Sequence, residues 1–240
     1  MRLFDIHSHI IPNVDDGSRN MDMSMDMLRI AYEDGTREII LTPHYILGKN
    51  SYKFDELENY FGELVDRSRV TFPDLKLYLG NEILYEDGVV SRLKNGEIHT
   101  MNGTRYILVE YNIRTPYSEI LHSIDEMTEA RYYPIIAHVE RYQALENRLD
   151  RIQEVIEKGC LLQMNISSVE GGFLNENKRW CRKLMKKGYI TFLGTDAHNT
   201  DSRAPYSQEY ITWIKKRCGD NAGWMLEEAA KIMVTGKIID

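Results

Sequence analysis

Cysteine and long apolar runs are scarce in this chain, and a net positive charge is absent. The three cysteines, Cys160, Cys181 and Cys218, are odd in number and form no C-x-x-C pair, which argues against a disulfide scaffold and a thiolate zinc site. No apolar run approaches the length of a membrane span, so we expect no direct membrane insertion. The formal net charge of −7 argues against a generic nucleic-acid binder, which is usually basic.

Internal boundaries are lacking as well. The 240 residues contain no Pro/Gly/Ser-rich linker, no shift in composition and no low-complexity tract, so we expect a single domain over residues 1–240. Hydrophobic residues make up 42% and charged residues 28%, the balance of a soluble globular protein. The first predicted strand begins at Leu3 and leaves no room for a signal peptide, so we expect a cytoplasmic protein.

A His-Ser-His motif follows directly on the first apolar segment. The segment Leu3-Phe4-Asp5-Ile6 suits a buried strand, and residues two apart in a strand point to the same side. His7 and His9 therefore aim two imidazoles at one point, a geometry that a metal ion can use. A single His-x-His pair is weak, because most such pairs are ordinary polar residues at a strand end. The pattern gains weight because it recurs along the chain.

Strands and helices alternate along the whole sequence. Apolar runs predict strands at 3–9, 38–42, 75–80, 106–109, 133–137, 160–165 and 189–194. Apolar residues at helical spacing predict helices at 22–34, 54–65, 89–93, 117–130, 146–158, 175–187, 206–217 and 222–234. Seven apolar strands that alternate with helices indicate an α/β fold with a parallel sheet covered by helices.

Imidazoles and carboxylates stand at the ends of nearly all the predicted strands. The carboxyl ends of the strands in a β/α barrel meet on one face, which holds the active site, so this placement favours a barrel over an open sheet. Taken singly, each residue can be read as a capping Asp, a strand-end Glu or a buried His. Together we interpret them as a metal cluster, to which Asp15 or Asp16 in the loop after the first strand adds a ligand. The other eight candidate ligands are His7, His9, His44, Glu82, Glu110, His138, Asp196 and His198.

The candidate ligands combine imidazole with carboxylate and include no thiolate. Such a set suits Mn, Fe, Zn or Co in a catalytic site rather than a structural zinc. Nine ligands exceed what one ion can take, so two or three ions with a bridging carboxylate are indicated. Clustered ions can activate a water molecule and stabilise attacking and leaving oxygens together, which predicts hydrolysis of a phosphate ester.

Two arginines follow candidate ligands closely. Arg141 lies three residues after one of them, and Arg203 lies five residues after another. A guanidinium can hold phosphate oxygens through paired hydrogen bonds, so both arginines are candidates for binding the phosphoryl group during catalysis. The alternative for Arg141 is a surface ion pair with Glu140 or Glu146.

Motifs spread over nearly the whole chain carry a resemblance to a known family, and they are specific as a set. They are Asp5-Ile6-His7-Ser8-His9-Ile10, Asp15-Asp16-Gly17, Thr42-Pro43-His44, Gly80-Asn81-Glu82-Ile83, Glu110 with Thr115-Pro116-Tyr117, Ile136-Ala137-His138-Val139-Glu140-Arg141-Tyr142, and Asp196-Ala197-His198-Asn199 followed by Arg203. With these motifs the chain resembles the polymerase and histidinol phosphatase (PHP) superfamily. Within that superfamily it resembles the bacterial capsule and exopolysaccharide protein-tyrosine phosphatases.

The resemblance implies a distorted (β/α)7 barrel with three metal ions, usually manganese, at the carboxyl ends of the strands. It favours Asp16 over Asp15 as the loop ligand. It also implies hydrolysis of phosphotyrosine, typically on the tyrosine-rich tail of a membrane-linked bacterial tyrosine kinase that drives polysaccharide export. The chain departs from the family pattern at Ser18, where Pro is frequent, and at Gly194-Thr195, where Ala-Ser is common. We expect neither departure to touch a ligand.

The expected reaction is in-line attack on phosphorus with the tyrosine phenolate as leaving group and no covalent intermediate. A cysteine-based mechanism is disfavoured, because none of the three cysteines has an arginine six residues later. Tyr45, Tyr85, Tyr111 and Tyr117 are candidates for lining a phosphotyrosine pocket.

Three other functions stay open at this point. The first is a phosphatase for histidinol phosphate or another small phosphomonoester on the same scaffold. The second is a nuclease of the same superfamily, which the acidic balance of the chain disfavours. The third is a metal-binding regulatory module that docks on the kinase without catalysis, which the full ligand set disfavours. The oligomeric state is open too, a homo-oligomer included.

Overall fold

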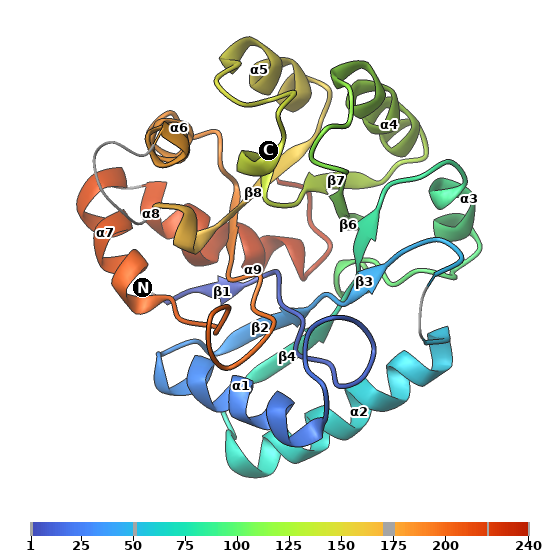
Figure 1. Cartoon of the computed structure of the whole chain (residues 1–240), viewed down its shortest axis with the longest axis vertical. Coiled ribbons are helices and arrows are strands. Elements are labelled where there is room, and N and C mark those ends of the chain that lie inside the picture. The colour runs from blue at the N-terminus through green and yellow to red at the C-terminus, as the bar shows by residue number, and fades with distance from the viewer. Residues whose placement is uncertain (1, 50–51, 170–175, 220, 240) are drawn as a thin grey trace.

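Short parallel strands lie at the centre of the molecule, and helices surround them (Figure 1). The structure is a computed structural model that describes residues 2–49, 52–169, 176–219 and 221–239. The strands in these parts of the chain are β1 (Phe4–Asp5), β2 (Glu38–Leu41), β3 (His44–Tyr45), β4 (Lys76–Leu79), β5 (Glu82–Leu84), β6 (Tyr106–Glu110), β7 (Tyr133–Ile136), β8 (Leu161–Asn165) and β9 (Phe192–Gly194).

Helices fill the connections between the strands. The α-helices of the described residues are α1 (Met21–Glu33), α2 (Phe54–Thr71), α3 (Val89–Lys94), α4 (Tyr117–Glu129), α5 (Leu149–Glu157), α6 (Glu176–Lys186), α7 (Gln208–Cys218), α8 (Asn221–Gly223) and α9 (Ala229–Met233). Three 3₁₀ turns, η1 (Met101–Gly103), η2 (Val139–Arg141) and η3 (Ile166–Val169), and one π-helical segment, η4 (Trp224–Glu228), complete them. Each helix that connects two parallel strands covers the sheet, as the alternating pattern predicted.

The strands pair in chain order in two sheets, β1-β2-β4 and β3-β5-β6-β7-β8-β9. The strands predicted at 38–42 and 75–80 correspond to β2 and β4. The sequence did not predict the short strands β3 and β5 that follow them. Thr42-Pro43 separates β2 from β3, and Pro43 has no N–H to give to a strand partner. The Pro43 carbonyl accepts the backbone N–H of Glu82 at 3.1 Å and the side-chain amide of Asn81, between β4 and β5, at 2.9 Å.

Backbone hydrogen bonds also join the first strand segment to the last. The N–H of Asp196 donates to the carbonyl of His7, and the N–H of His9 donates to the carbonyl of Ala197, both at 2.8 Å. Because β9 pairs with β8 on its other side, these bonds bring the two ends of the strand order together and curl the sheet. The His-Ser-His motif after β1 therefore lies beside the Asp-Ala-His motif after β9.

An apolar cluster fills the curled sheet at the amino ends of its strands. Phe4, Tyr106 and Phe192 are each the first residue of a strand, and all three are buried in this cluster. Helix α9 packs against them through Ala229, Ala230 and Met233. Fully burying one large apolar side chain contributes about 1.5–3 kcal/mol, so this end of the sheet is fixed by packing. The carboxyl ends of the strands are left for polar side chains.

Several predicted boundaries differ from the structure. The first strand is limited to Phe4–Asp5, because the chain after it curves toward Ala197. The predicted helix 146–158 begins only at Leu149, and the predicted helix 222–234 is divided by the π-helical segment η4. Asn175, the first residue of the predicted helix 175–187, lies outside the described residues. Among the described helices, none has both the length and the apolar composition that crossing a membrane requires.

Candidate metal centre and phosphate-binding residues

The nine candidate ligands come together at the carboxyl ends of the strands. Seven of them form three overlapping groups, and within each group the donor atoms lie within 4.8 Å of one another. His138 and Asp196 join through direct contacts with members of these groups. The groups are His9 with Asp16, His44 and His198; His7 with His9 and Glu82; and His44 with Glu82 and Glu110. Residues from seven separate stretches of sequence thus meet at one place.

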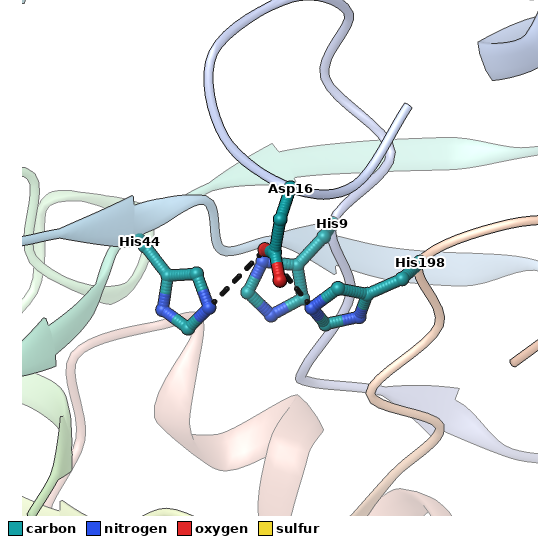
Figure 2. Close-up of side chains that lie close together, drawn as sticks. All are labelled: His9, Asp16, His44 and His198. Atoms are coloured by element: carbon teal, nitrogen blue, oxygen red, sulfur yellow. Dashed lines mark ion pairs between the residues drawn. The ribbon is translucent and has the colours of Figure 1, made fainter. Parts of the chain in front are cut away.

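The carboxylate of Asp16 reaches from the loop after β1 over three imidazoles (Figure 2). Its Oδ1 lies 3.3 Å from Nε2 of His198 and 3.4 Å from Nε2 of His44. Asp15 points elsewhere: its Oδ2 lies 2.7 Å from Nδ1 of His9 and accepts the backbone N–H of His44 at 3.0 Å. The two acids therefore have different positions: Asp16 lies over the three imidazoles, and Asp15 contacts Nδ1 of His9.

Glu82, the first residue of β5, lies at the centre of the site and is 1% exposed. Its Oε2 is 3.1 Å from Nε2 of His7, 3.2 Å from Nε2 of His9 and 3.1 Å from Nδ1 of His44. Its Oε1 is 2.8 Å from Nε2 of His138. A carboxylate that contacts four imidazoles has the position expected of a ligand shared between ions.

Two buried polar atoms at the centre of the site test whether cations fit there. Among the described residues, Nδ1 of His44 and Oε2 of Glu82 make no hydrogen bond although both are fully buried from solvent. Nε2 of His7 and Nε2 of His9 also face each other at 3.2 Å. Buried polar atoms are normally hydrogen-bonded or bound to an ion, so these donors fit a divalent cation that takes imidazole and carboxylate ligands.

The pKa shifts of these site residues favour positive charge on His9 and His44 and negative charge on Glu82. Burial lowers the pKa of His9, but Asp15 and Glu82 outweigh it and raise that pKa to about 9. Burial also lowers the pKa of His44, but the carboxylates of Glu110 and Glu82 outweigh it and raise that pKa to about 9. Burial raises the pKa of Glu82, but His7 and its other imidazole neighbours lower it well below its ordinary value. Protons and metal ions therefore compete for the same nitrogen atoms.

Asp196 connects the candidate ligands to the two arginines. Its Oδ1 lies 3.6 Å from Nε2 of His7 and 3.5 Å from Nε2 of His9. Nη2 of Arg203 lies 2.7 Å from the same oxygen, and Nη2 of Arg141 lies 2.7 Å from the other. Arg141 therefore faces the site and does not pair with Glu140 or Glu146, which was the alternative. Both arginine side chains are about 40% exposed, so they also remain accessible to a ligand.

Strand β8 carries no candidate ligand, but it supplies amides that hold the ligands of its neighbours. Oε1 of the fully buried Gln163 accepts the backbone N–H of His138 at 2.6 Å and lies 3.2 Å from Nδ1 of His7. Its Nε2 donates to Oδ1 of Asn165 at 3.1 Å, and Nδ2 of Asn165 donates to Oδ2 of Asp196 at 2.8 Å. Such partners fix the orientation of metal-binding side chains.

The sequence reasoning missed Gln163, and a signal for it was present: a glutamine stands inside the apolar run Leu161–Asn165. The predicted strand 160–165 ends at Asn165 and is the one predicted strand with no candidate ligand at its end. Tyr142, quoted above only as part of a motif, also contacts the site: its hydroxyl lies 3.2 Å from Nδ1 of His138. The spacing of Tyr142, four residues after that histidine, gave no direct signal because the turn η2 intervenes.

The backbone is strained at two candidate ligands and closely packed behind a third. His138 and Asp196 have φ values of 31° and 54°, the left-handed region that costs a residue other than glycine of order 1–3 kcal/mol. A Cβ atom at Gly194 would lie 2.6 Å from Cβ of His7. The expectation that Gly194 and Ser18 touch no ligand was therefore wrong: the N–H of Ser18 also donates to the His9 carbonyl at 3.0 Å. The sequence did not indicate either contact, because the residues that meet are not neighbours in the chain.

The tyrosines proposed for a phosphotyrosine pocket have different surroundings. Tyr85 and Tyr111 line a cavity of about 450 Å³ with Glu86, Asp87 and Glu119 rather than with the candidate ligands. Tyr45 is buried, and the hydroxyl of Tyr117 donates to Glu154 at 2.8 Å. The cavity that does reach Asp196, Arg141 and Arg203 is lined by Tyr206 and Tyr210, which the sequence reasoning did not single out.

The fold and this site together define a class: α/β proteins with parallel strands whose carboxyl ends gather imidazoles, carboxylates and arginines around a candidate metal centre. Within that class, the chain belongs to the family described as capsular polysaccharide synthesis, CpsB/CapC, whose profile matches residues 3–233.

Two bacterial tyrosine-protein phosphatases are similar to the chain over most of its length. The tyrosine-protein phosphatase CpsB of Streptococcus pneumoniae is 32% identical over 222 residues, which cover 90% of this chain and 91% of the relative. The tyrosine-protein phosphatase YwqE of Bacillus subtilis is 30% identical over 241 residues, which cover 99% of this chain and 93% of the relative. Both relatives are matched over nearly their full length.

Solved structures agree with this assignment. A structure from the crystallographic study of YwqE and CpsB, which describes them as metal-dependent tyrosine phosphatases, superposes with a TM-score of 0.89 at 29% identity and covers 98% of this chain and 96% of that one. Histidinol phosphate phosphatase from Lactococcus lactis superposes with a TM-score of 0.60 at 16% identity over 90% of this chain and 94% of that one. The second likeness shows a shared fold.

Proposed function

We propose that this chain is a metal-dependent protein-tyrosine phosphatase that hydrolyses phosphotyrosine and acts in capsule or exopolysaccharide synthesis. The observation that carries the proposal is the convergence of nine candidate ligands with two exposed guanidinium groups at one end of the sheet. Membership of the CpsB/CapC family and the activity of the relatives from S. pneumoniae and B. subtilis support it.

We further propose that the centre holds three divalent ions, Mn²⁺ by preference, one for each overlapping group of donors. The residues of these groups would hold the ions, with His138 and Asp196 as additional ligands. The carboxylate of Glu82, which has two oxygens, is the kind of ligand that two ions can share. Fe, Zn or Co also suit the donor set. When bound, such ions supply Lewis acidity and an activated water for attack on the phosphoryl group.

The residues of the chain have separate tasks in this proposal. Arg141 and Arg203 bind the phosphoryl oxygens, because both guanidiniums approach Asp196 at 2.7 Å from the exposed side of the site. Water adds to phosphorus as the bond to the phenolic oxygen breaks, and the products are inorganic phosphate and tyrosine. Phenolate, whose conjugate acid has a pKa near 10, leaves more readily than a serine alkoxide, so the reaction demands less proton donation.

The cysteines of the chain do not fit a thiol mechanism. Burial raises the pKa of Cys181 to about 12, and burial raises the pKa of Cys160 further. The thiolate is the nucleophilic form, and both groups stay protonated at neutral pH. This supports the metal-dependent reading over the cysteine-based one.

The fold and the setting of the enzyme belong to the same proposal. The hydrogen bonds between the ends of β1 and β9 support a distorted (β/α)7 barrel that is a single domain over residues 1–240. The substrate that we propose is the phosphotyrosine-bearing tail of a bacterial tyrosine kinase, which places the enzyme in the cytoplasm. The capsule context of the family supports this partner.

Hydrolysis of a phosphotyrosine peptide by Mn²⁺-loaded protein tests the proposal. We expect EDTA and His7→Ala to abolish turnover, and Arg141→Ala to lower kcat/KM by a factor on the order of 10²–10³, the usual effect of losing one charge-stabilising donor. Arg148→Ala is the matched control, since Arg148 forms an exposed ion pair with Asp150. Turnover that survives both EDTA and His7→Ala would contradict the proposal, and preference for histidinol phosphate would assign the small-molecule alternative.

A further inference from the structure

A cavity of about 400 Å³ opens beside the two guanidinium groups. Its charged lining residues are Arg141, Arg203, Asp196 and Asp201, and Ile166, Tyr206 and Tyr210 also line it. The cavity thus joins two guanidiniums, with carboxylates beside them, to aromatic and aliphatic surface. A ligand that combines an anionic group with an apolar ring would match both parts.

The other cavity that reaches the centre has a different character. It is lined by Asp15, Asp16, Glu110 and His44, with Lys49 as its cationic side chain. Asp16, His44 and Glu110 of this cavity are candidate metal ligands, so bound ions would offset its negative charge. The two guanidiniums of the other cavity offer paired hydrogen bonds to phosphoryl oxygens, which favours entry of a phosphorylated side chain from there.

The segment that carries Tyr206 is held in place from both sides. Oδ2 of Asp34, at the end of α1, accepts the N–H and the hydroxyl of Ser207 at 2.6 and 2.7 Å. Oδ1 of Asn199 accepts the backbone N–H of Arg203 at 2.9 Å. Tyr206 nevertheless stays 50% exposed, one of four large apolar side chains that are this exposed among the described residues. An exposed aromatic ring on a hydrogen-bonded segment, in the same cavity as two guanidiniums, can stack against a ligand ring.

We propose that Tyr206 forms the wall on which the phenyl ring of phosphotyrosine stacks while Arg141 and Arg203 hold its phosphoryl group. This inference rests on the proposed phosphatase function and adds to it the position of the ring. Tyr206 then favours aryl phosphates over alkyl phosphates, because an alkyl group offers no ring to stack. Aromatic pairs contribute about 0.5–1.5 kcal/mol beyond burial, which corresponds to a preference of about 2-fold to 12-fold.

Two phosphonates that are not hydrolysed separate ring binding from phosphoryl binding. Competitive inhibition constants for phenylphosphonate and methylphosphonate are measured on the Mn²⁺-loaded wild type, Tyr206→Ala, Tyr206→Leu and Tyr206→Phe. We expect Tyr206→Ala to weaken the binding of phenylphosphonate by about 2-fold to 12-fold and to leave the binding of methylphosphonate unchanged. Tyr206→Phe retains the ring and should behave as wild type, and Tyr206→Leu should resemble Tyr206→Ala.

The control variant is Val70→Ala, which removes an exposed apolar side chain on α2. Circular dichroism and thermal unfolding verify that each variant folds. Equal weakening of both phosphonates in Tyr206→Ala, or no change in either, would overturn the assignment of the ring site. Turnover of the phosphotyrosine peptide by the wild type is measured in parallel, so a failure of the phosphatase proposal is seen separately from a failure of the ring site.

Discussion

Replacing Gln163 by methionine tests whether the amides of β8 hold the metal-binding side chains. The side chain is fully buried, and methionine has a similar volume without hydrogen-bonding groups. The variant loses the acceptor for the N–H of His138, the contact with His7 Nδ1 and the donor to Asn165. Each buried group left without a partner costs about 1–3 kcal/mol. We expect clear destabilisation of the protein and a misoriented centre.

The expected loss of Mn²⁺ affinity is about 10-fold to 100-fold, the usual effect of removing a group that orients a metal ligand. Competition with a chelator measures the affinity, and thermal unfolding with and without Mn²⁺ measures stability. Gln163→Glu keeps an acceptor at the same position for His7 and His138, so it should retain more of the affinity than Gln163→Met. The exposed Gln153 on α5 gives the matched control, Gln153→Met. Wild-type Mn²⁺ affinity in a folded Gln163→Met protein would refute the reasoning.

Two further predictions concern His99 and the cysteines. Burial lowers the pKa of His99 from 6.5 to about 4. Between these pH values the unfolded chain binds a proton that the folded protein does not bind. The free energy of unfolding therefore falls as the pH falls from 6.5 toward 4. The full shift is worth about 3 kcal/mol, and partial exposure reduces this to about 1–2 kcal/mol. His99→Phe should flatten the difference between the unfolding free energies at pH 7 and pH 4.5 relative to wild type, and an unchanged pH dependence would contradict it. Iodoacetamide should leave phosphatase activity intact because Cys160 and Cys181 are buried thiols, and rapid inactivation by alkylation would speak for a thiol mechanism.

The sequence predicted which side chains come together, because most of them stand at strand ends. Each of His44, Glu110 and His138 follows or ends an apolar run, and parallel strands place such positions on one face. Local rules therefore sufficed to name the side chains that meet. They did not show how Asp15 and Asp16 divide their roles, since that depends on the path of the loop over His9.

The features that local rules missed depend on neighbours distant in sequence. At the break between β2 and β3, Pro43 has no N–H to donate, and its carbonyl accepts the side-chain amide of Asn81, 38 residues later in the chain. Gly194 matters because its backbone lies against His7, almost the full length of the chain away. The role of Gln163 depends on its contacts with His7 and His138, which follow β1 and β7. No periodicity within one element contains this information.

Diffraction from crystals of the Mn²⁺-loaded protein, recorded at the manganese absorption edge, tests the central claim most directly. The account predicts three anomalous peaks, one in each overlapping group of imidazoles and carboxylates around Glu82. Fully loaded crystals with manganese bound only elsewhere on the molecule, or with these side chains bonded solely to one another, would contradict it.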